Sequence, residues 1–207
     1  SHPDHIGAVF KIKEITGCKV CCNKNEQAWI ENIELQNQER SVPGFFNIVE
    51  NSCEIDFNFE EKQLLTLGKN TNVKCVSTPG HSNGSTSFLF EDYNILFTGD
   101  AIPLKNDIPN YDDYTQLMQS LEVIEKLSHD NLILTSWTPP LIEMDEKLQM
   151  ITEGREYTNK INNLVADIYF NHSRNEFENC AMVIEKLGLP HFLNTPLVSK
   201  TLKSHLH

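Results

Sequence analysis

Three short polar segments of this sequence combine imidazole or carboxylate side chains with turn residues. His2, Asp4 and His5 lie within the first five positions, His81 sits in a turn bounded by glycines, and Asp100 ends a Gly-Asp turn. Histidine nitrogens and carboxylate oxygens are the ligands that zinc and similar divalent ions take in proteins. Each segment alone also fits an ordinary surface turn, but together they predict a hydrolytic metal centre.

Two strand-like runs connect the second of these turns to the third. Residues 85–90 and 93–98 are rich in β-branched, aromatic and aliphatic side chains, and the acidic pair between them suits a tight turn. A hairpin of these runs would bring His81 and Asp100 to the same edge of a sheet. Loops on a rigid sheet can hold polar groups in a fixed arrangement, so this edge is the expected position of the site.

The first part of the chain is expected to contain short strands with interspersed helices. Apolar residues at helical spacing follow the first polar segment and run to Gly17. A short helix near 26–35 precedes an irregular connection that reaches residue 51 and could act as a flap or as a plain surface loop. Strand-like runs, most simply joined as an antiparallel meander, lie at 19–22, 53–59, 63–67 and 72–78.

The second part is mainly helical. Asp112 or Asp113 can cap an amphipathic helix that extends to Ser128, and a brief buried strand follows at 132–135. Helical patterns then begin at residue 143 and recur at 177–187 and 196–205. Strands with interspersed helices followed by a helical tail predict an α/β or α+β sandwich rather than a helical bundle.

Length, charge and cysteine usage exclude several classes of protein. A chain of 207 residues can bury a substantial core, and its net charge of -12 disfavours nucleic acid, whose phosphates need cationic partners. There is no apolar run of membrane-spanning length and no visible secretory segment. The six scattered cysteines are typical of reduced core thiols, so a cytoplasmic protein is expected.

The three polar segments also resemble, in order and in spacing, the motifs of the metallo-β-lactamase superfamily. SHPDHIG at 1–7 is similar to the end of the signature HxHxDH, TPGHSNGS at 78–85 to TPGHTxGS, and ILFTGDAI at 95–102 to VLFTGDxL. His2 and His81 are 79 positions apart. The resemblance covers the chain up to about Pro140, and the helical tail is similar to that of glyoxalase II-like and lactamase-like hydrolases.

This resemblance implies a fold and a domain organisation. The family fold is an αββα sandwich with its metal site at one edge of the two sheets. Residues 1–140 are then expected to form the metallo-β-lactamase-like domain, and 141–207 a helical C-terminal extension packed on the same domain.

The resemblance also implies a set of ligands and an activity. His2 and His81 resemble ligands of a first metal, Asp4 and His5 resemble ligands of a second, and Asp100 resembles the carboxylate that bridges the two. Asp4 and Asp100 are the implied catalytic carboxylates. The implied cofactor is zinc, as one or two ions, with iron or manganese as alternatives. Family members use a metal-bound hydroxide, which would hydrolyse a small-molecule ester, thioester, lactone or amide here.

The sequence departs from the family pattern at two places. The first histidine of the signature would lie two positions before His2, ahead of Ser1, so the domain is expected to be incomplete at its start. A sheet that lacks the strands usually found beside it should expose apolar surface and strand edges. Alternatively, it could pair with the sheet of a second copy in a homodimer.

The second departure is Trp137, which stands where the family usually has its last ligand histidine. Tryptophan cannot ligate a metal, so Trp137 is expected either to contact the substrate or to fill the space of the absent ligand. The alternative function is therefore a degenerate, poorly active member that acts as a binding or assembly protein. The expected partner of the active protein is a small molecule, not nucleic acid or a membrane.

Four histidines lie in or near the tail and are expected to be exposed: His172, His191, His205 and His207. His205 could approach the site only if the tail folds over it. Tyr157, on the long helix, is expected in the core.

Overall fold

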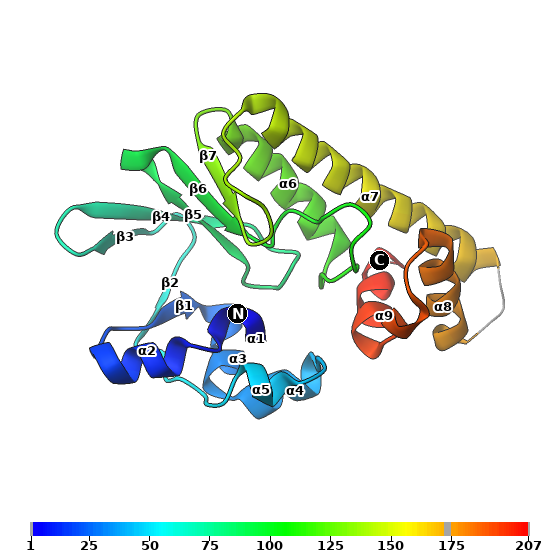
Figure 1. Cartoon of the computed structure of the whole chain (residues 1–207), viewed down its shortest axis with the longest axis horizontal. Helices are drawn as coiled ribbons and strands as arrows, with labels where there is room; N and C mark the ends of the chain where they lie inside the picture. Colours follow the sequence, from blue (N-terminus) through cyan, green and yellow to red (C-terminus); the bar gives the residue numbers. More distant parts are fainter. Residues whose placement is uncertain (1, 172–174, 207) are drawn as a thin grey trace.

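The computed structural model describes residues 2–171 and 175–206, and a five-stranded sheet lies at its centre (Figure 1). Neighbouring strands are antiparallel except for the last pair, in which β7 runs parallel to β6. The hairpin expected between the two polar turns is confirmed as β5 and β6. In spatial order the strands are β3 (Leu64–Leu67), β4 (Thr71–Ser77), β5 (Thr86–Phe90), β6 (Ile95–Gly99) and β7 (Leu132–Thr135).

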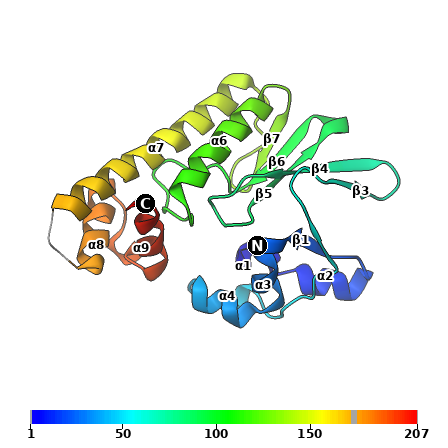
Figure 2. The ribbon, with the colours of Figure 1, turned by 180° about the vertical axis from the view of Figure 1, so that it is seen from behind.

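Two long helices, α6 (Tyr114–Ser128) and α7 (Met144–Asn171), cover one face of this sheet (Figures 1 and 2). Both were predicted from the sequence. The side chain of Asp113 accepts a hydrogen bond from the backbone of Gln116 and so caps α6, as expected. The core beneath the helices consists of Leu89, Leu96, Ile133, Leu121, Ile124 and Ile151.

The chain before the sheet forms a separate layer on the opposite side from α6 and α7 (Figures 1 and 2). Its own apolar cluster includes Ile30, Phe45 and Val49. Its elements are α1 (Pro3–Ile6), α2 (Val9–Thr16), β1 (Cys21–Asn23), α3 (Gln27–Glu31), α4 (Ile33–Glu39), α5 (Phe45–Ile48) and β2 (Phe57–Phe59).

The expected antiparallel meander is wrong for the first two strands. β1 and β2 pair in parallel, with Cys21 opposite Phe57, and form a two-stranded sheet apart from the main one. A parallel pair needs a long crossover, and helices α3, α4 and α5 provide it. The supposedly irregular connection before residue 51 therefore contains helix α5.

The first polar segment is also more regular than expected, because it is a helical turn. Pro3 occupies the first position of α1, where its fixed φ angle suits a helix and its missing N–H costs nothing. Asp4 and His5 follow within the same turn. Gly7 then lets the chain pass close to α5, since a Cβ atom there would lie 2.3 Å from the carbonyl oxygen of Ile48.

The helical tail was predicted correctly as α8 (Glu176–Leu187) and α9 (Pro196–Lys203), which pack at one end of α7 (Figure 1). A separate apolar cluster holds the tail together, and it includes Ile161, Val165, Ile184 and Leu202. The side chain of Thr201 in α9 bonds both the N–H and the carbonyl of Tyr111. These bonds fix α9 to the segment that leads into α6.

The tail histidines only partly follow the expectation. His191 is exposed, whereas His205 is largely buried, because it stacks on Tyr114 and bonds the hydroxyl of Tyr111 at 2.7 Å. His172 and His207 lie outside the described residues. Tyr157 is buried, as expected.

Apolar side chains are exposed on the sheet, as expected from the sequence. Phe97 points to the face opposite α6 and is 41% exposed, and Leu64 and Leu67 on the edge strand β3 are each 52% exposed. No helix within residues 2–171 and 175–206 is both long and apolar enough to span a membrane.

Candidate metal centre

The structure brings the three polar segments of the sequence together at one edge of the central sheet. His81 lies in the turn between β4 and β5, and Asp100 directly follows β6. Helix α1 approaches from the other layer and carries Asp4 and His5, while His2 is its N-cap. The five side chains predicted as ligands therefore come from three separate segments of the chain.

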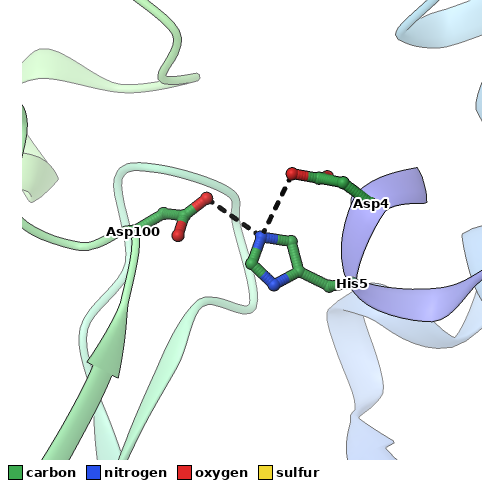
Figure 3. Close-up of side chains that lie close together, drawn as sticks. All are labelled: Asp4, His5 and Asp100. Atoms are coloured by element: carbon green, nitrogen blue, oxygen red, sulfur yellow. Dashed lines mark hydrogen bonds and ion pairs between the residues drawn. The ribbon is translucent and has the colours of Figure 1, made fainter. Parts of the chain in front are cut away.

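Three of these side chains form a tight group (Figure 3). His5 Nε2 lies 2.9 Å from Asp100 Oδ2 and 3.6 Å from Asp4 Oδ2. One ligand atom from each of Asp4, His5 and Asp100 lies within 4.8 Å of the others. Among the described residues this is the group of three or more histidine, cysteine or carboxylate side chains with the spacing of a metal site.

His2 and His81 form a second pair beside this group. His81 Nε2 lies 2.8 Å from His2 Nδ1 and 3.6 Å from Asp100 Oδ2, so Asp100 faces both pairs. His2 Nε2 and Asp100 Oδ1 are buried and have no hydrogen-bond partner among the residues that the structure describes. Buried polar atoms are nearly always bonded, so two such atoms on side chains of this group point to a bound ligand.

The turn that carries His81 packs directly against the start of α6. Gly80 has a φ angle of +124°, and a Cβ atom there would lie 2.3 Å from the backbone nitrogen of Leu117. Its carbonyl accepts hydrogen bonds from the backbone of Asp112 and Asp113, and Ser120 donates to the carbonyl of Pro79 at 2.6 Å. Only glycine allows this contact, which fixes the position of the imidazole.

Two buried charged residues that the sequence reasoning missed link the other layer to the site. Glu26 accepts a 2.6 Å bond from the backbone of Gly84, at the end of the His81 turn. Arg40, only 2% exposed, bonds Asp112 at 2.6 Å and also contacts Asn110. Glu26 ends a short 3-10 turn and Arg40 follows the end of α4, and no local pattern in these segments separates a buried charge from a solvated one.

Burial keeps the two adjacent histidines neutral. It lowers the pKa of His81, to which the positive charge of Arg40 adds, and it lowers the pKa of His2, with His81 and Arg40 as further causes. A neutral imidazole is the form that can ligate a metal. The pair is therefore in the protonation state that a metal site requires.

The electrostatics of His5 and Asp100 are different. The hydrogen bond to Asp100 raises the pKa of His5. Burial would raise the pKa of Asp100, but hydrogen bonds from His5 and Ser136 outweigh it and hold that pKa below its usual value. Asp100 is thus a carboxylate in the folded protein.

A pocket of about 580 Å³ opens onto these side chains. His2, Asp4, His81 and Asp100 lie in its wall, together with Trp137, whose side chain is half-exposed. The pocket also reaches the tail, where residues from 192 to 198 form part of its wall. The tail therefore reaches the site, although its sequence has no motif that indicates a substrate.

The donor set fits a divalent cation. Imidazole nitrogens and carboxylate oxygens are provided, two of the donor atoms are buried without partners, and both members of the histidine pair are neutral. Trp137 offers no donor for a metal, so the described residues supply at most two histidines and one carboxylate, or one histidine and two carboxylates, around each of two ions.

Comparisons with known proteins agree with this architecture. A family model for the metallo-beta-lactamase superfamily matches residues 1–137. The hydroxyacylglutathione hydrolase of Hyphomonas neptunium is 32% identical over 101 residues, which cover 49% of this chain and 30% of that protein. The probable metallo-hydrolase YqgX of Bacillus subtilis is 25% identical over 154 residues, covering 72% of this chain and 70% of that one.

Solved structures show the same fold. A beta-lactamase domain protein from Burkholderia ambifaria superposes with a TM-score of 0.71 at 16% identity, covering 99% of this chain and 64% of that chain. The protein TTHA1623, solved in a di-iron-bound form, gives a TM-score of 0.55 at 19% identity, covering 72% and 71%. The predicted fold class, with its helical C-terminal region, is thereby confirmed.

Proposed function

The chain belongs to the metallo-beta-lactamase superfamily, and we propose that it is a metal-dependent hydrolase of a small-molecule ester, thioester, lactone or amide. One observation carries the proposal: five ligand-type side chains from three segments meet at a sheet edge that opens into a pocket. The relatives named as a hydroxyacylglutathione hydrolase and a probable metallo-hydrolase support the reaction class.

The chain provides donors for two neighbouring cations. His2, His81 and Asp100 would hold the first, and Asp4, His5 and Asp100 the second, with Asp100 between them. Zinc is the proposed metal, and iron or manganese would suit the same donors. Such a cation supplies Lewis acidity, which makes water more acidic and polarises a carbonyl group.

The residues of the chain orient the reactants and handle protons. The side chain of Asp4 is 48% exposed and faces the group at 3.6 Å from His5 Nε2, so its carboxylate is placed to take a proton from the attacking water and return it to the leaving group. Asp100, 8% exposed, stays ionised and compensates positive charge. Trp137, at the edge of the pocket, is proposed to contact the substrate.

Trp137 also favours the second candidate, a degenerate member that acts as a binding or assembly protein. Its side chain is 57% exposed and lines the pocket beside Asp4 and Asp100, where the family pattern has a ligand. Loss of a ligand usually weakens the affinity for a metal. A site with Trp137 could therefore bind substrate-like molecules with little turnover.

Hydrolysis before and after metal exchange separates the two candidates. Protein stripped with a chelator and reloaded with zinc, manganese or iron would be assayed against ester, thioester, lactone and amide substrates. The hydrolase requires turnover that is lost on stripping and restored by reloading, and that falls strongly in the Asp4→Asn variant. If the reloaded protein hydrolyses none of these substrates, the result favours the binding protein.

A further inference from the structure

The pocket extends well beyond the side chains assigned to metal binding, and that part of it has its own chemistry. Besides the ligands, its wall includes Ile102 and Leu104 from the segment after β6, and Leu193, Leu197 and Val198 from the tail. These side chains cannot ligate a metal or move a proton. Their role at the site must be contact with a bound molecule or with each other.

The wall beyond the ligands is apolar and partly open. Val42 and Pro43 approach from the other layer, and Phe192 of the tail contributes to the wall although it is 79% exposed. A volume of about 580 Å³ falls within the range of pockets that hold small organic ligands. An exposed phenylalanine beside a cavity of this size provides apolar surface on which a bound hydrocarbon chain can pack.

The charges in the wall are all negative. Asp4, Asp100 and Asp107 line the pocket, and no lysine or arginine within the described parts of the chain does so. Arg40 is the nearby cation that acts on His2 and His81, but its guanidinium is engaged with Asp112 and Asn110. With a net charge of -12 for the whole chain, the wall beyond the metal ligands has no basic side chain among the described residues to balance a carboxylate on the body of a ligand.

We propose that this pocket binds the uncharged, apolar body of the substrate, of the size of a medium-length acyl chain, and rejects substrates whose body carries carboxylates. The inference rests on the proposed hydrolase function for the position of the reacting group, which would lie at Asp100 and His81. It narrows the substrate class to neutral esters, thioesters, lactones or amides with an apolar body. Thioesters of an anionic thiol, such as glutathione, fall outside it.

Binding to metal-free protein tests this inference without hydrolysis. Straight-chain amides from butanamide to decanamide would be titrated calorimetrically into chelator-treated protein, beside the same amides with a carboxylate at the far end of the chain. Each buried methylene should tighten binding about fourfold. Each amide with a terminal carboxylate should bind at least about tenfold more weakly than the plain amide. Equal binding of the two series, or no effect of chain length, would overturn the proposal.

A variant pair locates the binding. Leu197→Lys places a cation in the pocket wall, so it should weaken binding of decanamide and tighten binding of the same amide with a terminal carboxylate. Phe177→Lys is the matched control, because Phe177 is 68% exposed on α8 and does not line the pocket. It should leave both affinities unchanged. If Leu197→Lys behaves like Phe177→Lys, the amides bind elsewhere and the proposal is wrong.

The two proposals can fail separately. A protein that binds amides as expected but never hydrolyses an ester contradicts the hydrolase function and keeps the apolar pocket. A protein that hydrolyses esters with no preference for apolar over anionic bodies keeps the hydrolase function and contradicts the pocket.

Discussion

At Asp100, one carboxylate oxygen bonds His5 at 2.9 Å, while the other is buried without a partner among the described residues. His2 Nε2 is likewise buried without a hydrogen-bond partner among the described residues. Leaving a buried polar atom unpaired costs about 1–3 kcal/mol. A bound cation would remove this cost for an atom that it contacts, which is the residue-scale reason to expect a metal here.

Trp137 gives the first prediction at this scale. Trp137→His should tighten zinc binding by about tenfold or more, because it adds an imidazole beside Asp4 and Asp100 in the pocket wall. Zinc titration of the variant and of wild-type protein measures the change. Trp137→Phe is the control, since it removes the indole without adding a donor. Indistinguishable affinities in the histidine and phenylalanine variants would refute the position assigned to this residue.

His205 gives a prediction for pH. Burial lowers its pKa to about 4 from the ordinary 6.5, so the unfolded chain binds a proton first as the pH falls. The contribution of neutral His205 to the free energy of unfolding is complete above pH 6.5 and is lost progressively toward pH 4. The loss reaches about 2 kcal/mol at pH 5. In His205→Gln, where this group cannot titrate, stability should fall correspondingly less between pH 7 and pH 5.

Denaturant unfolding in the presence of a chelator measures this difference, because the chelator removes any change in metal binding with pH. The other titrating groups are common to both proteins and cancel in the comparison. Parallel pH profiles for wild type and variant would show that burial does not hold His205 neutral in the folded protein.

The residues that the sequence made visible are those that carry a motif. His2, Asp4, His5, His81 and Asp100 were all named from spacing and turn chemistry, and the structure brings them together. Glu26 and Arg40 were missed because their burial depends on packing between distant segments. No local pattern of a sequence contains that information.

At the scale of elements, the His81 turn and helix α6 behave as one unit. Gly80 presses its backbone against Leu117, and its carbonyl accepts bonds from the two aspartates that begin the helix. The turn thus has its position set by a helix more than 30 residues later in the chain. Such a contact makes the imidazole rigid without any direct bond to it.

Gly80→Ala should therefore lower the free energy of unfolding by about 3 kcal/mol or more, since the added methyl group collides with α6 and the φ angle of +124° strains any L side chain. Gly68→Ala is the matched control. Gly68 also has a positive φ angle, of +62°, but a Cβ atom there meets nothing within 4 Å, so only about 1 kcal/mol is expected.

Chemical denaturation of both variants provides the comparison. Equal losses in the free energy of unfolding would mean that backbone strain alone acts at position 80. The close packing of Gly80 against α6 would then contribute nothing.

Elements with a clear period were predicted well, and those defined by distant partners were not. The β5–β6 hairpin, α6, α7 and the tail helices follow from local alternation, caps and turns. The parallel pairing of β1 with β2 does not, because a crossover of more than 30 residues joins them. Helix α1 was taken for a loop because four residues are too few to show a period.

At the scale of the whole molecule, three apolar clusters are joined by specific contacts. Ile151 of α7 lies in the cluster under the sheet, while Ile161 of the same helix lies in the cluster of the tail. Thr201 of α9 bonds Tyr111, and Glu26 of the other layer bonds Gly84. The segment after the boundary near residue 140 therefore shares an apolar cluster and the Thr201–Tyr111 hydrogen bonds with the segment before it.

We therefore expect residues 1–140 and 141–207 to unfold together. Tryptophan fluorescence reports on Trp29 and Trp137, both in the first segment, whereas far-ultraviolet circular dichroism is dominated by helices that include α7, α8 and α9. The two signals should give the same transition midpoint. Separate midpoints would show that the tail is an independent unit.

The central claim is that this site holds a catalytic cation, and zinc titration of chelator-treated protein tests it most directly. Wild-type protein should bind at least about half an equivalent of zinc at micromolar or tighter affinity. Trp137→Ala should bind similarly, because it removes no ligand. Asp100→Asn should bind little or none, because Asp100 faces both donor sets. Less than half an equivalent in wild-type protein, or equal zinc in Asp100→Asn and Trp137→Ala, would contradict the claim.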